Sequence, residues 1–213
     1  MRSLPTLLLI ALLTLLPAPA DAQLAGRTAQ DWINTLDAPA RVASMRVPEM
    51  VAALKIAPGQ IVADVGAGSG AVSGPLAIAT GPKGVMYAVD IEQGLLTHIA
   101  DRATKLQLTN IRTVLGAFTD PKLPVPVDLA FMNDVLHHVQ DRAAYLKSLA
   151  TYLKPGGRLA IVDFHPDKSP HAAQPELTVT EAQTEGWLKA AGLVLSEKVT
   201  LFDDRFYLIY RKP

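Results

Sequence analysis

The segment Val62-Ala63-Asp64-Val65-Gly66-Ala67-Gly68-Ser69-Gly70 decides the fold of this chain. It begins as an apolar strand and continues into a turn that has glycine at alternate positions. Glycine lets the backbone adopt positive φ and approach a ligand closely, because it has no side chain to collide. A strand that ends in such a turn is typical of nucleotide-binding α/β proteins. Asp64 places a negative charge where many of these folds bind phosphate, so the segment favours a cationic, nucleotide-like ligand.

Apolar strands alternate with helical patterns after this segment. We expect strands at 61–65, 85–90, 111–115, 127–132 and 158–164, and helices at 71–80, 95–106, 142–153 and 180–191. Strands separated by helices form a largely parallel sheet with helices on both faces. Two last strands, 194–201 and 206–211, are joined only by Phe202–Arg205, and so short a connection permits only an antiparallel hairpin. The expected fold is therefore α/β and doubly wound, with a seven-stranded, mostly parallel sheet that ends in an antiparallel hairpin.

The first residues have the pattern of a secretory signal. Arg2 precedes an apolar run over 7–16, Pro17 ends that run, and Ala20-Asp21-Ala22 offers a small-x-small cleavage site. The run is shorter than the roughly 20 residues that span a bilayer. We therefore expect export to the periplasm or the medium. An uncleaved N-terminal membrane anchor is the alternative.

Three segments follow from this pattern. Residues 1–22 are expected to be the signal peptide, 23–57 an N-terminal helical cap, and 58–213 a single α/β domain. The mature chain is expected to contain no membrane span.

Composition excludes several classes of function. The 213 residues include 20 basic and 20 acidic side chains, so no overall field attracts nucleic acid. The chain has no cysteine, which excludes disulfides, thiolate metal sites and cysteine nucleophiles.

Asp64 and Asp90 discriminate between two kinds of nucleotide ligand. Asp90 ends the strand 85–90, where a carboxylate can accept hydrogen bonds from both hydroxyls of a ribose. Gly66-x-Gly68-x-x-Ala71 also fits a dinucleotide fingerprint. However, two unit charges about 4 Å apart near a protein surface interact by roughly 4 kcal/mol, so Asp64 opposes a pyrophosphate. S-adenosylmethionine has no phosphate, and Asp64 would help to hold its sulfonium and ammonium groups.

Four motifs carry a resemblance to a known family. They are Asp64–Gly70, Tyr87–Asp90, Asp128–His138 and Leu153–Leu159. In this order they resemble the motifs of class I S-adenosylmethionine-dependent methyltransferases, and the likeness covers roughly residues 45–213. The resemblance implies S-adenosylmethionine as the cofactor, a small-molecule acceptor and an antiparallel last strand. It places the cofactor against Asp64, Gly66, Ala67, Gly68, Gly70, Asp90, Ile91, Ala117, Phe118 and Asn133.

One position departs from the family pattern. The family often has Gly-Asp-Ala after the third strand, with the acid near the adenine amino group, whereas this chain has Gly116-Ala117-Phe118. Ala117 cannot accept that hydrogen bond. Phe118 either stacks on the adenine or is a core aromatic, and Asp120 is a nearby substitute acid.

The segment Asn133–His138 follows the fourth strand and should line the acceptor side of the site. Histidine has a suitable pKa for a general base, so His137 and His138 are the candidate bases, or else they pack at a helix start. Asp134 either orients one of them or caps that helix, and capping is the preferred role. Asp163 and His165 also reach this side or form a structural turn. His137, His138, His165 and His171 show no metal-ligand spacing, so no metal is expected.

Two other functions remain open from the sequence. The chain is expected to transfer a methyl group from S-adenosylmethionine to a small molecule, for which a quinone or another small hydrophobic acceptor is one possibility. An exported binding protein that keeps the pocket without catalysis is the second reading. An NAD(P)-dependent oxidoreductase is the third.

Overall fold

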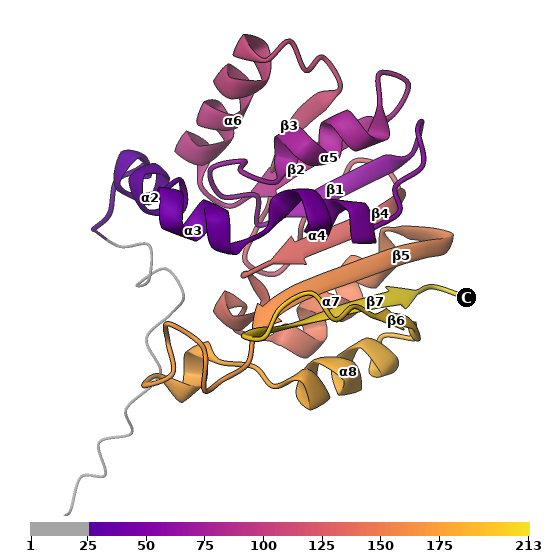
Figure 1. Ribbon diagram of the computed structural model, residues 1–213. Coiled ribbons are helices and arrows are strands. Elements are labelled where there is room, and N and C mark those ends of the chain that lie inside the picture. The colour runs from indigo at the N-terminus through magenta and orange to yellow at the C-terminus, as the bar shows by residue number, and fades with distance from the viewer. Residues whose placement is uncertain (1–25) are drawn as a thin grey trace, which may run out of the picture.

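The computed structural model describes residues 26–213, and the expected signal peptide lies outside them (Figure 1). The α-helices are α2 Ala29–Leu36, α3 Pro39–Ser44, α4 Val47–Ala53, α5 Ser73–Thr80, α6 Gln93–Lys105, α7 Arg142–Thr151 and α8 Glu181–Ala190, with 3-10 turns η1 Leu136–His138 and η2 Pro175–Leu177. The strands are β1 Ile61–Val65, β2 Val85–Asp90, β3 Ile111–Leu115, β4 Val127–Asn133, β5 Leu153–Phe164, β6 Val194–Lys198 and β7 Arg205–Arg211.

The strands form one seven-stranded sheet in the order β3-β2-β1-β4-β5-β7-β6. All pairings from β3 through β5 are parallel, whereas β7 is antiparallel to both β5 and β6. This confirms the expected mixed sheet with a reversed hairpin. The chain moves from β1 outward to β3 and then returns to the other side of β1 with β4. Ligands of such sheets bind at the carboxyl ends of the strands beside this reversal.

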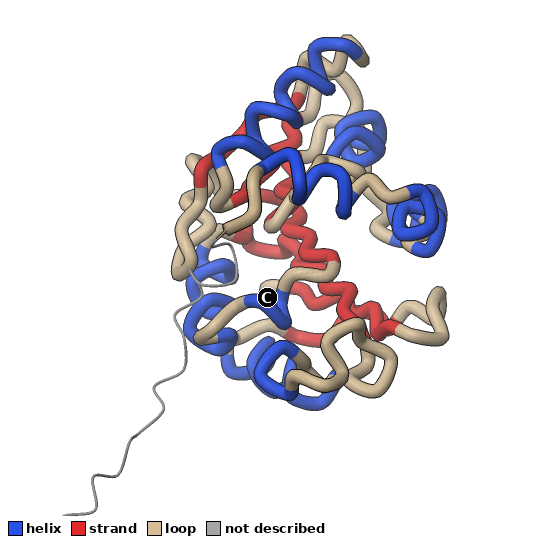
Figure 2. Tube along the Cα trace, turned by 90° about the vertical axis from the view of Figure 1, so that its left-hand side faces the viewer, coloured by secondary structure: helices blue, strands red, loops and turns tan. Residues whose placement is uncertain are grey.

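Alternate residues of each strand face two separate hydrophobic layers. In β4, Leu129 and Phe131 pack with α4, α5 and α6, while Ala130 and Met132 pack with α7 and α8. The helices therefore cover both faces of the sheet, as Figure 1 and the edge view in Figure 2 show. Burial on both faces explains the almost continuous apolar runs of the central strands.

The start of β5 and the length of the β6–β7 connection differ from the sequence-based expectations. β5 begins at Leu153 instead of 158, because Leu153 pairs with Val127 of β4, and Gly156 and Gly157 exchange backbone hydrogen bonds with Lys212. The connection between β6 and β7 is longer than expected. α8 begins within the expected range, with a capping box formed by Thr180 and Gln183. Within the described part of the chain, no helix is both long and apolar enough to cross a membrane.

Candidate functional site

The glycine turn between β1 and α5 has the backbone that its sequence predicts. Gly66, Gly68 and Gly70 have φ values of +77°, +57° and +79°. A Cβ on Gly66 would lie 2.4 Å from Cγ2 of Val135, and one on Gly70 would lie 2.8 Å from Cγ1 of Ile99. Both the dihedral angles and the close neighbours therefore require glycine. The amide nitrogens of Gly66 and Ala67 bind the carbonyl of Val89, which ties the turn to β2.

Asp90 supports this turn from the end of β2. Its carboxylate accepts hydrogen bonds from the amides of Gly68 at 2.8 Å and Glu92 at 3.0 Å. Burial raises the pKa of Asp90, while backbone hydrogen bonds from Glu92, Gly68 and Ile91 oppose that rise. A carboxylate has about four lone-pair sites, so Asp90 retains acceptor capacity for a ribose hydroxyl.

Asp64 lies buried beneath the turn, with 3% of its surface exposed. The hydroxyl of Ser73 donates to its Oδ2 at 2.6 Å. Burial raises the pKa of Asp64 to about 6, the Ser73 hydrogen bond opposes this rise, and the charge of Asp90 adds to it. A cationic ligand near Asp64 would oppose this rise by favouring the charged carboxylate.

The N-terminal helices lie over the same turn. Leu36 of α2 packs against Gly68, where an added Cβ would meet Cδ1 of Leu36 at 3.0 Å. The Ser69 hydroxyl donates to Asp37 at 2.6 Å, directly after α2. Figure 1 shows α2 beside α6 at the edge where the strands end. Residues that precede the glycine turn in the sequence therefore lie over the expected cofactor side.

Met45 and Trp32, two large residues of the N-terminal helical region, have different environments. Met45, at the end of α3, is 1% exposed, and its sulfur lies 3.6 Å from the side-chain nitrogen of Asn133. Trp32 instead stacks under the guanidinium of Arg27 at 4.0 Å. Met45 therefore packs against a candidate cofactor residue.

The loop after β3 carries the residues that are expected near adenine. Phe118 is 42% exposed, so the expectation of a core aromatic is wrong, and its ring is available for stacking. Ala117 pairs with Asp120 through backbone hydrogen bonds. Oδ1 of Asp120 accepts from the hydroxyl of Tyr152 at 2.9 Å, which binds the proposed substitute acid to α7 and β5. Ile91, half-buried, follows Asp90 at the other edge.

His137 is held by Asp163 rather than by Asp134. Nδ1 of His137 lies 2.7 Å from Oδ1 of Asp163, and the His137 amide donates to Oδ2 at 3.1 Å. The His137 and Asp163 side chains are 5% and 1% exposed. Because β5 lies next to β4, its terminal acid reaches the 3-10 turn that follows β4.

Asp134 forms a different cluster, and the preferred capping role is wrong. Val135 is the N-cap of η1, and no side chain caps this turn. Asp134 has φ of +56° and pairs with Arg41 of α3 at 3.5 Å and Arg205 of β7 at 3.4 Å. Burial raises the pKa of Asp134, and the two guanidinium groups oppose this rise. The acid therefore joins three elements at the acceptor side.

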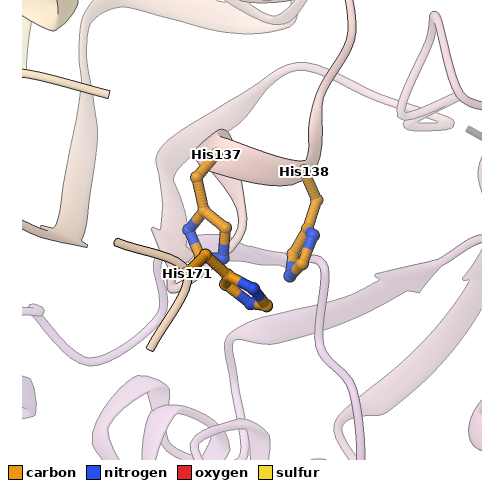
Figure 3. A group of neighbouring side chains, drawn as sticks. All are labelled: His137, His138 and His171. Carbon is orange, nitrogen blue, oxygen red and sulfur yellow. The ribbon is translucent and has the colours of Figure 1, made fainter. Parts of the chain in front are cut away.

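The structure brings together three of the four histidines that the sequence singled out at this side. Figure 3 shows the rings of His137, His138 and His171 gathered around one small volume. His165 is not among them, because its ring packs against Phe206 with centroids 5.8 Å apart. Packing around His138 and the neighbouring imidazoles of His137 and His171 lower the pKa of His138 to about 4, although part of its side chain is open to solvent.

Sequence reasoning missed Arg41 and Arg205. Neither lies in a motif, and they are separated from Asp134 by long stretches of chain. The available signal was the acid itself, since a carboxylate that follows a buried strand requires a cationic partner when it is not exposed.

A comparison with models of protein families identifies the family of this chain. Residues 56–200 match the family described as "Methyltransferase domain". The chain belongs to this methyltransferase family. The match includes the glycine turn, Asp90, the histidine pair and the hairpin's first strand, so the motifs and the fold agree.

Curated relatives and solved structures place this methyltransferase-family chain among diverse proteins. It is 38% identical over 117 residues to the 2-phytyl-1,4-naphtoquinone methyltransferase of Synechococcus elongatus, covering 53% of this chain and 49% of that protein. It is 33% identical over 156 residues to an uncharacterized 37.1 kDa protein of a Streptomyces fradiae transposon, covering 72% and 43%. The chain thus spans less than half the length of these curated relatives.

Among solved structures, the fold is similar to that of a SAM-dependent methyltransferase from Aquifex aeolicus. The TM-score is 0.77 at 24% identity, over 87% of this chain and 98% of the other. Magnesium protoporphyrin IX methyltransferase from Synechocystis, with bound SAH, matches with a TM-score of 0.66 at 20% identity, over 88% of each chain.

Proposed function

We propose that this protein transfers the methyl group of S-adenosylmethionine to a small-molecule acceptor. The observation that supports this proposal most directly is that two buried acids, Asp64 and Asp90, lie beneath and beside the glycine turn. Burial, and to a smaller extent the charge of Asp90, raise the pKa of Asp64, and a sulfonium or an ammonium group nearby would favour its charged form. A pyrophosphate would add negative charge to the same place.

The topology also opposes the dinucleotide alternative. Dinucleotide-binding sheets consist of two similar halves on either side of the reversal. Here the half beyond β4 contains the antiparallel β7 and β6. Membership of the methyltransferase family agrees with this reading.

A small acceptor fits the names of the curated relatives. They include methyltransferases of a phytyl naphthoquinone and of phosphoethanolamine. The acceptor side of this chain contains both apolar and charged groups, with Met45, Phe164 and Phe202 near the pair of Arg205 and Asp134. We therefore propose an acceptor with an aromatic or hydrophobic body and a polar group that loses a proton on methylation.

Titration calorimetry with the purified chain tests the proposal. We expect S-adenosylmethionine and S-adenosylhomocysteine to bind at micromolar concentrations and NADH not to bind. In Asp90→Ala the affinity should fall by at least 30-fold, because hydrogen bonds to a charged group contribute about 1.5–3 kcal/mol each. Absence of binding by both sulfur ligands would refute the proposal. Binding without transfer of a labelled methyl group to any of a panel of quinols and phenols would favour the non-catalytic binding protein.

We also propose that the domain acts after export. The N-terminal pattern of residues 1–22 supports this location, and the donor must then reach the outer compartment. Cell fractionation followed by N-terminal sequencing tests it. A mature chain that begins at Gln23 outside the cytoplasm is expected, whereas an intact Met1 in the membrane fraction would favour the anchor.

A further inference from the structure

Three imidazoles converge at the acceptor side from two segments that are far apart in the sequence. His137 and His138 belong to η1, and His171 lies in the loop after β5 (Figure 3). One ring nitrogen of each lies within 4.8 Å of those of the other two. Nitrogen ligands of a tetrahedral ion at about 2.0–2.1 Å are roughly 3.3 Å apart, so modest side-chain rotation would complete such a site.

Oxygen acceptors orient two of the three rings. Nδ1 of His137 faces the carboxylate of Asp163, and Nδ1 of His171 lies 3.2 Å from the amide oxygen of Gln174. Carboxylate and amide oxygens only accept hydrogen bonds, so each Nδ1 carries the proton and each Nε2 keeps its lone pair. Histidines that bind metals almost always donate their other ring N–H to such an oxygen.

Arg142 connects the two segments that carry these rings. Its guanidinium donates to the carbonyls of Leu136 and His137 in η1 and to the carbonyl of Glu176 in η2. The His171 amide in turn donates to the buried hydroxyl of Ser169 at 3.0 Å. Hydrogen bonds from the Arg142 side chain to main-chain carbonyls therefore add to the ring contacts of His171 with His137 and His138 in keeping the two segments together.

From this geometry we infer that His137, His138 and His171 form a binding site for a divalent first-row metal ion of the zinc class. Imidazole nitrogen suits Zn²⁺ and its neighbours, whereas Mg²⁺ and Ca²⁺ prefer oxygen ligands. Three protein ligands leave a fourth position for water or for a substrate oxygen. His138 is partly open to solvent, which gives an ion and a ligand access to the site. The inference reverses the expectation of no metal.

The proposed role of the ion, unlike its binding, rests on the proposed methyl transfer. An acceptor hydroxyl at the open position would lose its proton to solvent, because a bound ion lowers the pKa of a coordinated oxygen. The oxygen then forms a bond to the methyl carbon as the carbon–sulfur bond breaks. The electron pair remains on sulfur, and S-adenosylhomocysteine leaves.

Metal binding can be measured on the full, untagged chain, since a histidine tag would itself bind metal. After chelator treatment and dialysis against Zn²⁺, we expect about one zinc per chain by elemental analysis. Co²⁺ should give the visible absorption of a tetrahedral nitrogen site. In His171→Ala the Zn²⁺ affinity should fall at least tenfold, and Gln174→Ala should weaken it less. His165→Ala is the matched control and should bind Zn²⁺ like the wild type.

Equal Zn²⁺ affinity of the wild type and His171→Ala would overturn the inference, as would stoichiometry well below one. Thermal unfolding of His171→Ala checks that the variant is folded. S-adenosylhomocysteine binding, measured on the same samples, separates the two proposals. A chain that binds S-adenosylhomocysteine but no zinc refutes the metal site alone, and the converse result refutes the proposed function alone.

Discussion

The cofactor side and the acceptor side of this site are built in different ways. The expected cofactor side is centred on one continuous turn at the ends of β1 and β2, with acids from the same two strands. The acceptor side collects Arg41, Asp134, His171 and Arg205 from four separate parts of the chain. The first side is specified by local backbone conformation, whereas the second depends on the completed fold.

The largest expected loss of stability and of cofactor affinity follows substitution of Gly66, which packs against Val135. Gly66→Ala puts a methyl group against Val135 in a left-handed conformation, which should cost about 2–5 kcal/mol of unfolding free energy. S-adenosylhomocysteine affinity should fall more than 100-fold by calorimetry. Gly156→Ala is the control, because Gly156 also has positive φ but has no heavy atom near an added Cβ. If Gly66→Ala binds the cofactor normally, the turn is not the cofactor site.

The acceptor side should respond differently to Asp134→Ala. This change removes the carboxylate between Arg41 and Arg205 and leaves Arg205 with only the more exposed Asp204 at 3.5 Å, so the loss should be about 1.5–3 kcal/mol of unfolding free energy. Chemical denaturation measures this loss. Cofactor affinity of the folded variant should change less than threefold. A large loss of affinity with unchanged stability would mean that Asp134 belongs to the cofactor side.

Asp64→Asn should stabilise the free protein at neutral pH and weaken cofactor binding. Burial raises the Asp64 pKa from its ordinary value to about 6, so the folded state retains a proton that the unfolded state has lost. Stability from this group therefore falls as pH rises from about 4 to 6, by on the order of 1–3 kcal/mol. Denaturation at pH 4 and pH 7.5 should show that Asp64→Asn removes this fall.

Binding measurements complete the Asp64→Asn test. S-adenosylmethionine should lose more affinity than S-adenosylhomocysteine, because only the former has a sulfonium charge. Equal losses for both ligands would place Asp64 away from the sulfur, and a variant less stable than wild type at pH 7.5 would contradict the burial argument.

Phe118→Ala should have the smallest effect. The ring is exposed, so unfolding free energy should change by no more than about 0.5 kcal/mol. Loss of aromatic stacking on adenine should weaken S-adenosylhomocysteine binding by about 3- to 10-fold. Phe118→Tyr keeps the ring and should bind like the wild type. Unchanged affinity in Phe118→Ala would leave adenine recognition to the backbone around Ala117.

The sequence predicted the sheet and the cofactor turn well, because both depend on short-range patterns. Buried strands appear as apolar runs, and the turn required glycine at φ values that other residues avoid. The residues around the expected adenine position were harder to predict from the sequence. Whether Phe118 is exposed depends on the path of the loop after β3, which periodicity does not encode.

The acceptor side could not be predicted because sequence separation hides it. Asp163 reaches His137 only because β5 pairs with β4, and His171 reaches the same place through the loop beyond β5. Asp134 was assigned to capping because acids before helical segments usually cap them. Its left-handed backbone and the two arginines are properties of the tertiary structure.

The contact of α2 with the cofactor turn has a kinetic consequence. This eight-residue helix buries no side chain fully, and its contacts are few: Ala29 lies against Gly94, Leu36 lies over Gly68, and Asp37 accepts from Ser69 and pairs with Arg102. So small a unit opens at far lower free energy than the whole domain. A nucleoside held beneath it would exchange at the rate at which α2 lifts, and turnover would then be timed by the N-terminal helix rather than by the strands that hold the ligand.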